Sequence, residues 1–255
     1  MTTSGVALHK AYAVTHVGCV RVRNEDSILL KQDMEKNCLL AVVADGMGGH
    51  QGGATASATA VELFDAGWDL LQSGTRLVDS LLDGHWLTRI AQLAHEAIRI
   101  KALQDTELAS MGTTLVVAAL CGNRASIAHI GDSRAYRFNG ADLLQVPLDH
   151  SLVQRMVDDG AMTESEAERS PLRNYLTRSL GGGDQSGKPD ICALEMQAGE
   201  RLLLCSDGLT NMLGHDEIGA ILAGNEDDEM ACQCLLKLAL DRGASDNVSI
   251  IVVTV

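Results

Sequence analysis

The segment Leu39–His50, LLAVVADGMGGH, joins a short apolar run to a glycine-rich turn. Leu, Val and Ala fill Leu39–Ala44 and turn residues follow, which predicts a strand that ends at Asp45. Gly46 has no side chain, so its carbonyl oxygen can come close to a metal ion. The rival interpretation is a nucleotide-binding loop. It fails because Gln51 stands where G-x-G-x-x-G needs its third glycine.

Three more aspartates occupy the same kind of position as Asp45, at the end of an apolar run beside glycine or a small polar residue. They are Asp132, Asp207 and Asp246. Each alone is typical of a turn. Strand ends converge in a layered sheet, however, and converging carboxylates repel one another unless cations neutralise them. Ligands that are all oxygen favour Mg²⁺ or Mn²⁺.

The rest of the chain predicts an antiparallel, mixed α+β fold, because helical stretches are grouped between sets of strands. Asn139-Gly140 between two apolar runs predicts a β-hairpin. We expect residues 1–255 to form a single domain. The predicted strands are Ser27–Leu30, Leu39–Ala44, Thr113–Leu120, Ala125–Ile130, Arg134–Phe138, Leu143–Val146, Arg201–Cys205 and Val248–Val255, and the predicted helices are Ala54–Leu71, Leu87–Leu103, Ser151–Asp159, one capped by Thr163 and Glu166, and Asp228–Leu240.

Composition excludes several classes of protein. A net charge of -14 makes nucleic acid an unfavourable partner. No stretch has the roughly 20 apolar residues of a membrane span, and no signal segment begins the chain, so we expect no membrane anchor. The seven cysteines contain no Cys-x-x-Cys pair, which argues against zinc. We therefore expect reduced thiols and a cytoplasmic protein.

Six segments, in order along the chain, resemble the motifs of the phosphatase 2C family of metal-dependent Ser/Thr protein phosphatases, and bacterial members most of all. The resemblance runs from about Val14 to the C-terminus and implies two packed antiparallel β-sheets, a β-sandwich flanked by helix pairs on both sides in four layers, α-β-β-α. The segments are Arg21–Asp26, Ala44–His50, Met111–Thr114, His129–Arg134, Cys205–Leu209 and Ser245–Val248.

The resemblance also implies roles for the aspartates. Asp45 would bridge two Mn²⁺ or Mg²⁺ ions, and Gly46 would give its carbonyl oxygen to the first. Asp207 and Asp246 would bind the second ion. A third, weaker ion would lie between Asp132 and Asp207.

Three further residues complete the site that the resemblance implies. Asp26 would hold metal-bound water, and Arg21 would contact the substrate phosphate with two donors at once. A water between two divalent cations becomes hydroxide near neutral pH and attacks phosphorus in line. His50 is our candidate for the proton donor to the leaving oxygen, because histidine titrates in the right range.

One departure lies in a flap at about residues 149–183. Bacterial relatives often carry a His-Pro pair there, and this chain has Ser170-Pro171. The expected substrates are phosphoserine and phosphothreonine in proteins, including a Ser/Thr kinase and its targets, with the enzyme acting as a monomer. The alternative is a catalytically inactive regulatory module of the same fold. A haloacid-dehalogenase-type phosphatase is disfavoured because the chain has no Asp-x-Asp.

Overall fold

The strand β3 (Cys38–Met47) lies at the centre of the molecule and is buried on both faces. The structure, a computed structural model, describes residues 9–48, 51–73, 77–182 and 187–255. Along β3, Leu40 and Val42 pack toward the helices, whereas Leu39, Ala41 and Val43 pack between two sheets. A strand covered on both sides must be apolar at every position, which explains its uninterrupted hydrophobic run.

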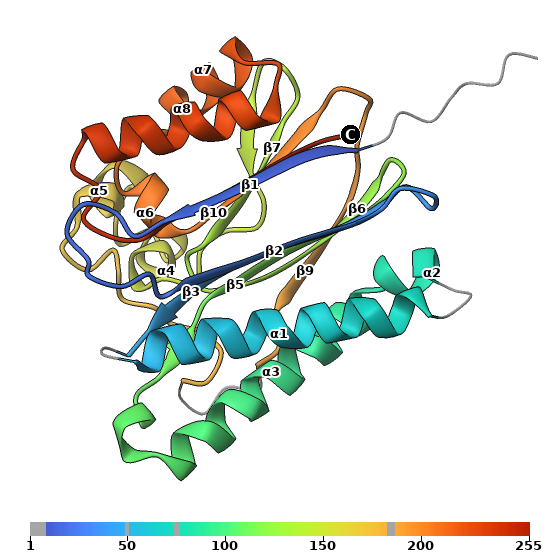
Figure 1. Ribbon diagram of the computed structural model, residues 1–255. Helices are drawn as coiled ribbons and strands as arrows, with labels where there is room; N and C mark the ends of the chain where they lie inside the picture. Colours follow the sequence, from blue (N-terminus) through green and yellow to red (C-terminus); the bar gives the residue numbers. More distant parts are fainter. Residues whose placement is uncertain (1–8, 49–50, 74–76, 183–186) are drawn as a thin grey trace, which may run out of the picture.

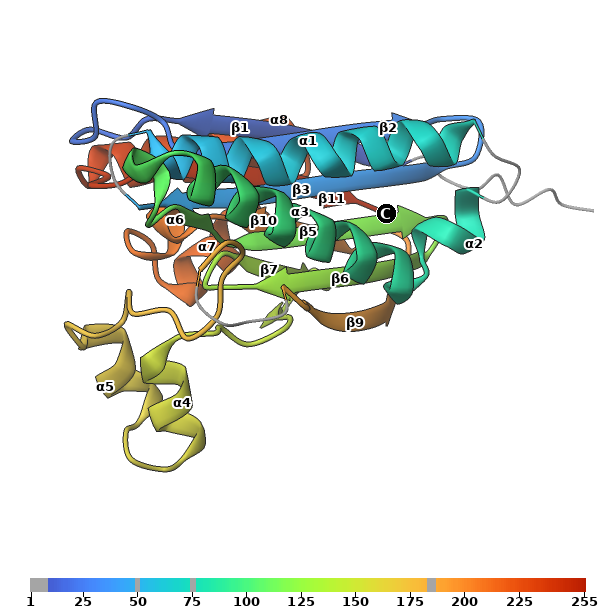
Figure 2. The same cartoon turned by 90° about the horizontal axis from the view of Figure 1, so that it is seen from below.

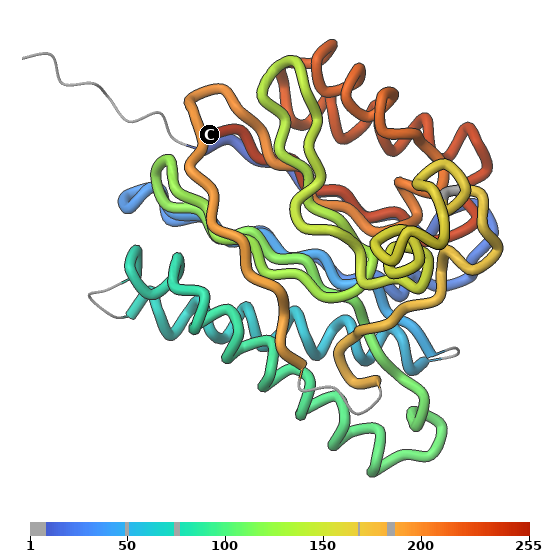
Figure 3. The backbone as a smooth tube through the Cα atoms, turned by 180° about the vertical axis from the view of Figure 1, so that it is seen from behind, coloured from blue at the N-terminus to red at the C-terminus, as the bar shows by residue number. Residues whose placement is uncertain are grey.

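Two antiparallel sheets pack face to face (Figure 1). The first and last described strands pair in the first sheet, where β1 runs beside β11 (Figure 3). The first sheet has the order β1 (Lys10–His16), β11 (Val248–Thr254), β10 (Arg201–Cys205), β7 (Arg134–Phe138) and β8 (Leu143–Gln145). The second has the order β2 (Asp26–Asp33), β3, β5 (Leu115–Cys121), β6 (Arg124–Ile130) and β9 (Asp190–Glu195), and β4 (Gly112–Thr113) pairs with β3.

Helix pairs cover the outer faces of both sheets, which confirms the α-β-β-α sandwich (Figure 1). The second sheet is covered by α1 (Gly52–Gln72) and α3 (Gly84–Gln104), and the first by α7 (His215–Gly224) and α8 (Asp228–Asp241). None of the helices in the described ranges is long and apolar enough to cross a membrane. The short helices are α2 (Leu77–Leu81), the 3-10 helix η1 (Thr106–Leu108), α4 (Leu152–Asp158), α5 (Glu164–Arg169) and α6 (Asp207–Thr210).

The flap carries α4 and α5 and projects from one end of the sandwich (Figure 2). The predicted capping box at the start of α5 is confirmed, since Thr163 and Glu166 bond to each other's backbone N–H. The hairpin between β7 and β8 is also confirmed. Its turn is closed by the Asn139 side chain, which accepts hydrogen bonds from two backbone N–H groups, and by Gly140 at φ +95°.

Several expectations from sequence were wrong in detail. Within the predicted helix Leu87–Leu103, Leu93 is 47% exposed although Ala91 and Ala94 beside it are buried. The strands β1 and β9 were not predicted. Both lie at sheet edges and are only half buried, so their sequences lack a strong apolar signal.

The expectation of free thiols is wrong for one pair of cysteines. Cys38 and Cys121 stand directly opposite each other on β3 and β5 and form a disulfide. The other cysteines are free thiols. The pairing depends on the register of two strands that lie 83 residues apart in sequence, which cannot be read from cysteine spacing.

A buried ion pair attaches β10 to the helical layer above it. The Arg201 side chain donates to Asp228 Oδ1 at 2.7 and 3.1 Å and to the carbonyls of Leu222 and Asn225. Both charged residues are 5% exposed. The pair thus holds the ends of α7 and α8 over the strand that leads to Asp207.

We expect Asp228→Ala to lower the free energy of unfolding by about 3–5 kcal/mol, because it leaves the Arg201 charge buried without a partner. Urea unfolding followed by circular dichroism measures this. Glu217→Ala is the control, since Glu217 forms an exposed pair with Arg242 and its loss costs much less. Equal losses in the two variants would contradict the assignment.

Candidate active site

Asp45 stands near the end of β3, and its backbone is held on both sides. Its N–H donates to Thr114 Oγ1 at 3.0 Å, and its carbonyl accepts from the Thr114 N–H and the Thr113 hydroxyl, both at 2.9 Å. The Met111–Thr114 motif therefore supports the Asp45 backbone directly. On the other side, β2 places Asp26 opposite Asp45 in the ladder.

The carboxylates predicted from sequence converge on Asp45. Asp26, Asp207, Asp132 and Asp246 all act on its carboxyl through space. Asp207 begins α6 two residues after the end of β10, and its charge raises the pKa of Asp45. Asp246 lies just before β11 in the same sheet. Five aspartates from separate segments of the chain thus bring their side chains to one end of the sandwich.

Asp26 is the most buried of the group, at 8% exposed. Its Oδ2 accepts from the hydroxyls of Ser249 at 2.6 Å and Ser206 at 2.8 Å, whereas Oδ1 is buried with no partner among the described residues. Burial raises the pKa of Asp26 to about 7, although the two serines oppose the shift. Asp207 and Asp246 raise it further.

The pKa values of Asp45, Asp132 and Asp207 are shifted in the same direction. Burial raises the pKa of Asp45 and of Asp132 well above the usual range, and neighbouring carboxylates add to both shifts. Burial also raises the pKa of Asp207, and Asp246 adds to that shift. Arg134 opposes the shifts at Asp132 and Asp207. Without cations, the cluster therefore stores electrostatic repulsion that protons or metal ions relieve.

The chemistry of this donor set suits hard divalent cations. Asp207 Oδ1 is buried without a hydrogen-bond partner among the described residues, so it has a lone pair available for a cation. Within those residues, no three His, Cys, Asp or Glu side chains are placed to hold one metal ion together, so a bound ion would take most of its ligands from water and backbone oxygens. Mg²⁺ takes only one or two carboxylates and keeps several waters, and Mn²⁺ accepts the same oxygen ligands. The cluster fits such ions.

Glycines let the backbone pack closely around the cluster. A Cβ on Gly46 would lie 2.2 Å from the Gly53 carbonyl oxygen and 2.6 Å from that of Glu25. A Cβ on Gly208 would lie 1.9 Å from the Asn247 oxygen. Gly46 and Gly208 are therefore glycine because neighbouring backbone atoms come too close to leave room for a side chain. Neither has the positive φ of a turn glycine.

Arg21 lies at the exposed rim of the cluster. Its Nη2 donates to Asp246 Oδ2 at 2.7 Å. This hydrogen bond raises the pKa of Arg21, and nearby Glu25 and Asp45 raise it further. The guanidinium is about half exposed, so its remaining N–H donors face solvent beside the carboxylates.

Asn247 holds the loop that carries Arg21, a role that sequence reasoning missed. Its side chain accepts from the Glu25 N–H at 2.8 Å and donates to the carbonyls of Val17 and Arg23, both at 2.9 Å. Ser206 and Ser249, which hold Asp26, were also missed. The signal for Asn247 was its place next to Asp246 in the Ser245–Val248 motif.

The flap is joined to the site at its first residues. Arg134 donates to both oxygens of Asp149 at 2.6–3.0 Å, and Gln145 donates to Asp149 at 2.7 Å. His150 bonds through its backbone and its ring to Gly131, which precedes Asp132. Ser170, which precedes Pro171 in the flap, accepts a hydrogen bond from the Leu172 N–H. His50 lies outside the described residues.

Comparison with known proteins identifies the family. Residues 20–233 match the family model described as protein phosphatase 2C. The chain belongs to the protein phosphatase 2C family. It is 34% identical to protein phosphatase PhpP of Streptococcus pneumoniae, over 94% of this chain and 95% of that protein.

Solved structures agree with this membership of the protein phosphatase 2C family. The serine/threonine phosphatase Stp1 from Staphylococcus aureus is 31% identical, with a TM-score of 0.88 over 98% of this chain and 96% of that one. The catalytic domain of the phosphatase PstP, in complex with two manganese ions, is 33% identical, with a TM-score of 0.82 over 97% and 98%.

We expect Mn²⁺ to bind more tightly as the pH rises, because cations compete with protons for carboxyls of raised pKa. Protons on these carboxyls stabilise the cation-free fold. Its free energy of unfolding therefore falls as the pH rises from about 4, the ordinary pKa of Asp, through about 7, the pKa of Asp26. Calorimetry should give a dissociation constant about tenfold lower at pH 8 than at pH 6 for a proton displaced from a group with a pKa of about 7.

The same experiment has a stability readout. Mn²⁺ should raise the melting temperature, relative to EDTA, more at pH 8 than at pH 6. Equal increments at both values would show that the aspartate cluster does not bind the cation.

Proposed function

We propose that this protein is a Mn²⁺- or Mg²⁺-dependent protein Ser/Thr phosphatase. The observation that carries the proposal is the convergence of five aspartates, from elements far apart in sequence, beside the exposed guanidinium of Arg21. Membership of the protein phosphatase 2C family supports it. So does the manganese that the related PstP catalytic domain binds.

In this proposal Asp45, Gly46, Asp207 and Asp246 hold two ions, and Asp132 with Asp207 holds a third, weaker one. When bound, the ions make water more acidic and offset charge on the phosphoryl oxygens. The half-buried position of the carboxylates leaves the cluster open to a substrate from solvent.

Two other side chains then have defined tasks. Arg21 keeps one Nη on Asp246 and offers its remaining donors to the phosphate, which fixes the phosphate next to the cluster. Asp26 is fixed by two serine hydroxyls through Oδ2, so its free Oδ1 accepts a hydrogen bond from the attacking water. With a pKa of about 7, it can also hold that proton near neutral pH.

No observation favours the inactive regulatory module. Such a module would lose a metal-binding carboxylate, whereas Asp45, Asp207 and Asp246 are all present and face one another. The proposal extends to partners: a Ser/Thr kinase and its targets would supply the phosphorylated side chains, and the enzyme would act as a monomer.

We expect Asp207→Asn and Asp45→Asn each to lower kcat/KM more than about a hundredfold, because each removes a negative charge from the cation site. Hydrolysis of p-nitrophenyl phosphate and of phosphothreonine peptides with added Mn²⁺ measures the loss. Asp79→Asn, an exposed change on α2, is the control. Full activity of the unchanged enzyme in excess EDTA would refute the proposal.

Arg21→Ala should lower kcat/KM for a phosphothreonine peptide roughly ten- to hundredfold, since one charged hydrogen-bonding group is lost. Arg21→Lys should recover only part of the activity, because an ammonium cannot donate two parallel hydrogen bonds. The Mn²⁺ affinity of both variants should stay close to that of the parent. If the lysine variant were fully active, the two-donor contact with phosphate would be wrong.

A further inference from the structure

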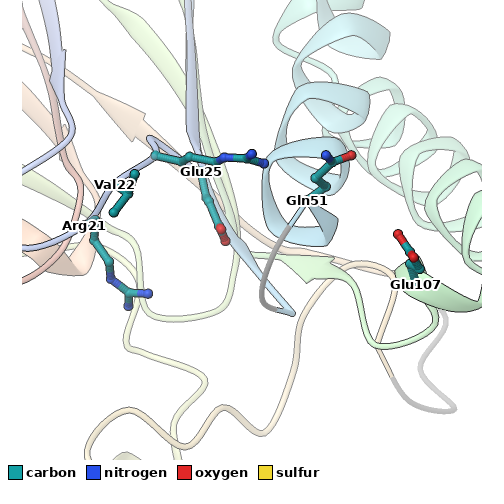
Figure 4. A pocket seen from close by; sticks show the side chains of 6 residues that line it. Arg21, Val22, Glu25, Gln51 and Glu107 are labelled. Carbon is teal, nitrogen blue, oxygen red and sulfur yellow. The ribbon is translucent and has the colours of Figure 1, made fainter.

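A pocket of about 660 Å³ opens beside the aspartate cluster, and the reaction proposed above does not use it. Arg21 lines the pocket and also bonds to Asp246, so the pocket is continuous with the site. Figure 4 shows Arg21, Val22 and Glu25 on one side, with Gln51 at the start of α1 and Glu107 of η1 across from them. A volume of this size holds a few side chains of a bound peptide.

Arg23 also lines this pocket, and its backbone is firmly placed. The Asn247 side chain donates to the Arg23 carbonyl and also holds Glu25 and Val17. Since Asn247 directly follows Asp246, the Arg23 backbone is fixed relative to the cluster. This contact fixes the backbone position from which the Arg23 side chain extends toward the pocket.

Some charged side chains that line the pocket already interact with other residues of the protein, and one is available to bind a ligand. Arg21 is bonded to Asp246, and the Glu25 charge acts on Arg21. Arg23 is exposed, and in the part of the chain that the structure describes no ion pair or side-chain hydrogen bond engages it. It is therefore a cation available at the pocket wall, on a protein whose net charge is -14.

We propose that this pocket is a subsite for the residues that flank the phosphorylated serine or threonine, and that Arg23 pairs there with an anionic side chain. This proposal rests on the phosphatase function proposed above. The anion would be a carboxylate or a second phosphate, since a guanidinium binds both. Glu107 on the opposite wall repels the same anion, so the peptide binds with its anionic side chain toward Arg23.

The proposal is tested with phosphothreonine peptides that carry a single glutamate, or the matched glutamine, at each position from three before to three after the phosphothreonine. The unchanged enzyme should prefer glutamate about two- to fivefold in kcat/KM at one or two positions, as for a solvent-exposed ion pair. Arg23→Ala should remove that preference, and Arg23→Glu should reverse it, so that the glutamine peptide becomes the better substrate. A peptide with phosphoserine at the preferred position distinguishes a second phosphate from a carboxylate.

The control is Arg124→Ala, which also removes one positive charge. Arg124 begins β6, whereas Asp132 follows the last residue of that strand, so Arg124 lies far from the cluster. It should retain the glutamate preference. Retention of the preference in Arg23→Ala, or no preference at any position in the unchanged enzyme, would overturn the subsite. Fluorescence anisotropy with non-hydrolysable phosphonate peptides gives the same comparison as dissociation constants. A protein that showed this selectivity without hydrolysing p-nitrophenyl phosphate would disprove the phosphatase function and leave the subsite standing.

Discussion

The main physical constraint on this structure is the mutual repulsion of the carboxylates gathered at one end of the sandwich, which the rest of the fold must offset. Burial and neighbouring charge raise the pKa values of Asp26, Asp45, Asp132 and Asp207, so a cation-free cluster carries excess protons at equilibrium. Such an arrangement is unfavourable for folding alone and becomes favourable when divalent cations occupy it. Packing within the two sheets and their helices therefore stabilises the aspartate cluster against the repulsion between its carboxylates.

The register of the strands keeps the carboxylates of the cluster close together. Asp26 and Asp45 face each other because β2 and β3 pair from Asp26 to Asp33, with both strands anchored in the core between the sheets. A slip of one residue would turn Asp45 to the other face of its sheet. The pairing of β2 with β3 thus fixes the direction of the Asp45 carboxylate.

The sequence predicted the parts of this arrangement that have local signals. Apolar runs ending in Asp-Gly marked the strands beside Asp45 and Asp207, and ordered motifs indicated the sandwich. Side-chain partners drawn from distant strands were not predictable. Ser206 and Ser249 reach Asp26, and Cys38 reaches Cys121, only through pairings between elements that no local pattern specifies. Half-buried edge strands such as β1 were missed for a related reason, because their weak alternation depends on what packs against them.

The flap and the site share backbone contacts, which limits how specificity can arise. One flap stem bonds through His150 to Gly131 beside Asp132, and the other pairs through Leu180 with Thr113, whose hydroxyl supports Asp45. The flap is therefore attached at both stems to the residues that position the carboxylates. The proposed subsite lies on a different segment, the loop held by Asn247, which brings Arg21 and Arg23 to the pocket.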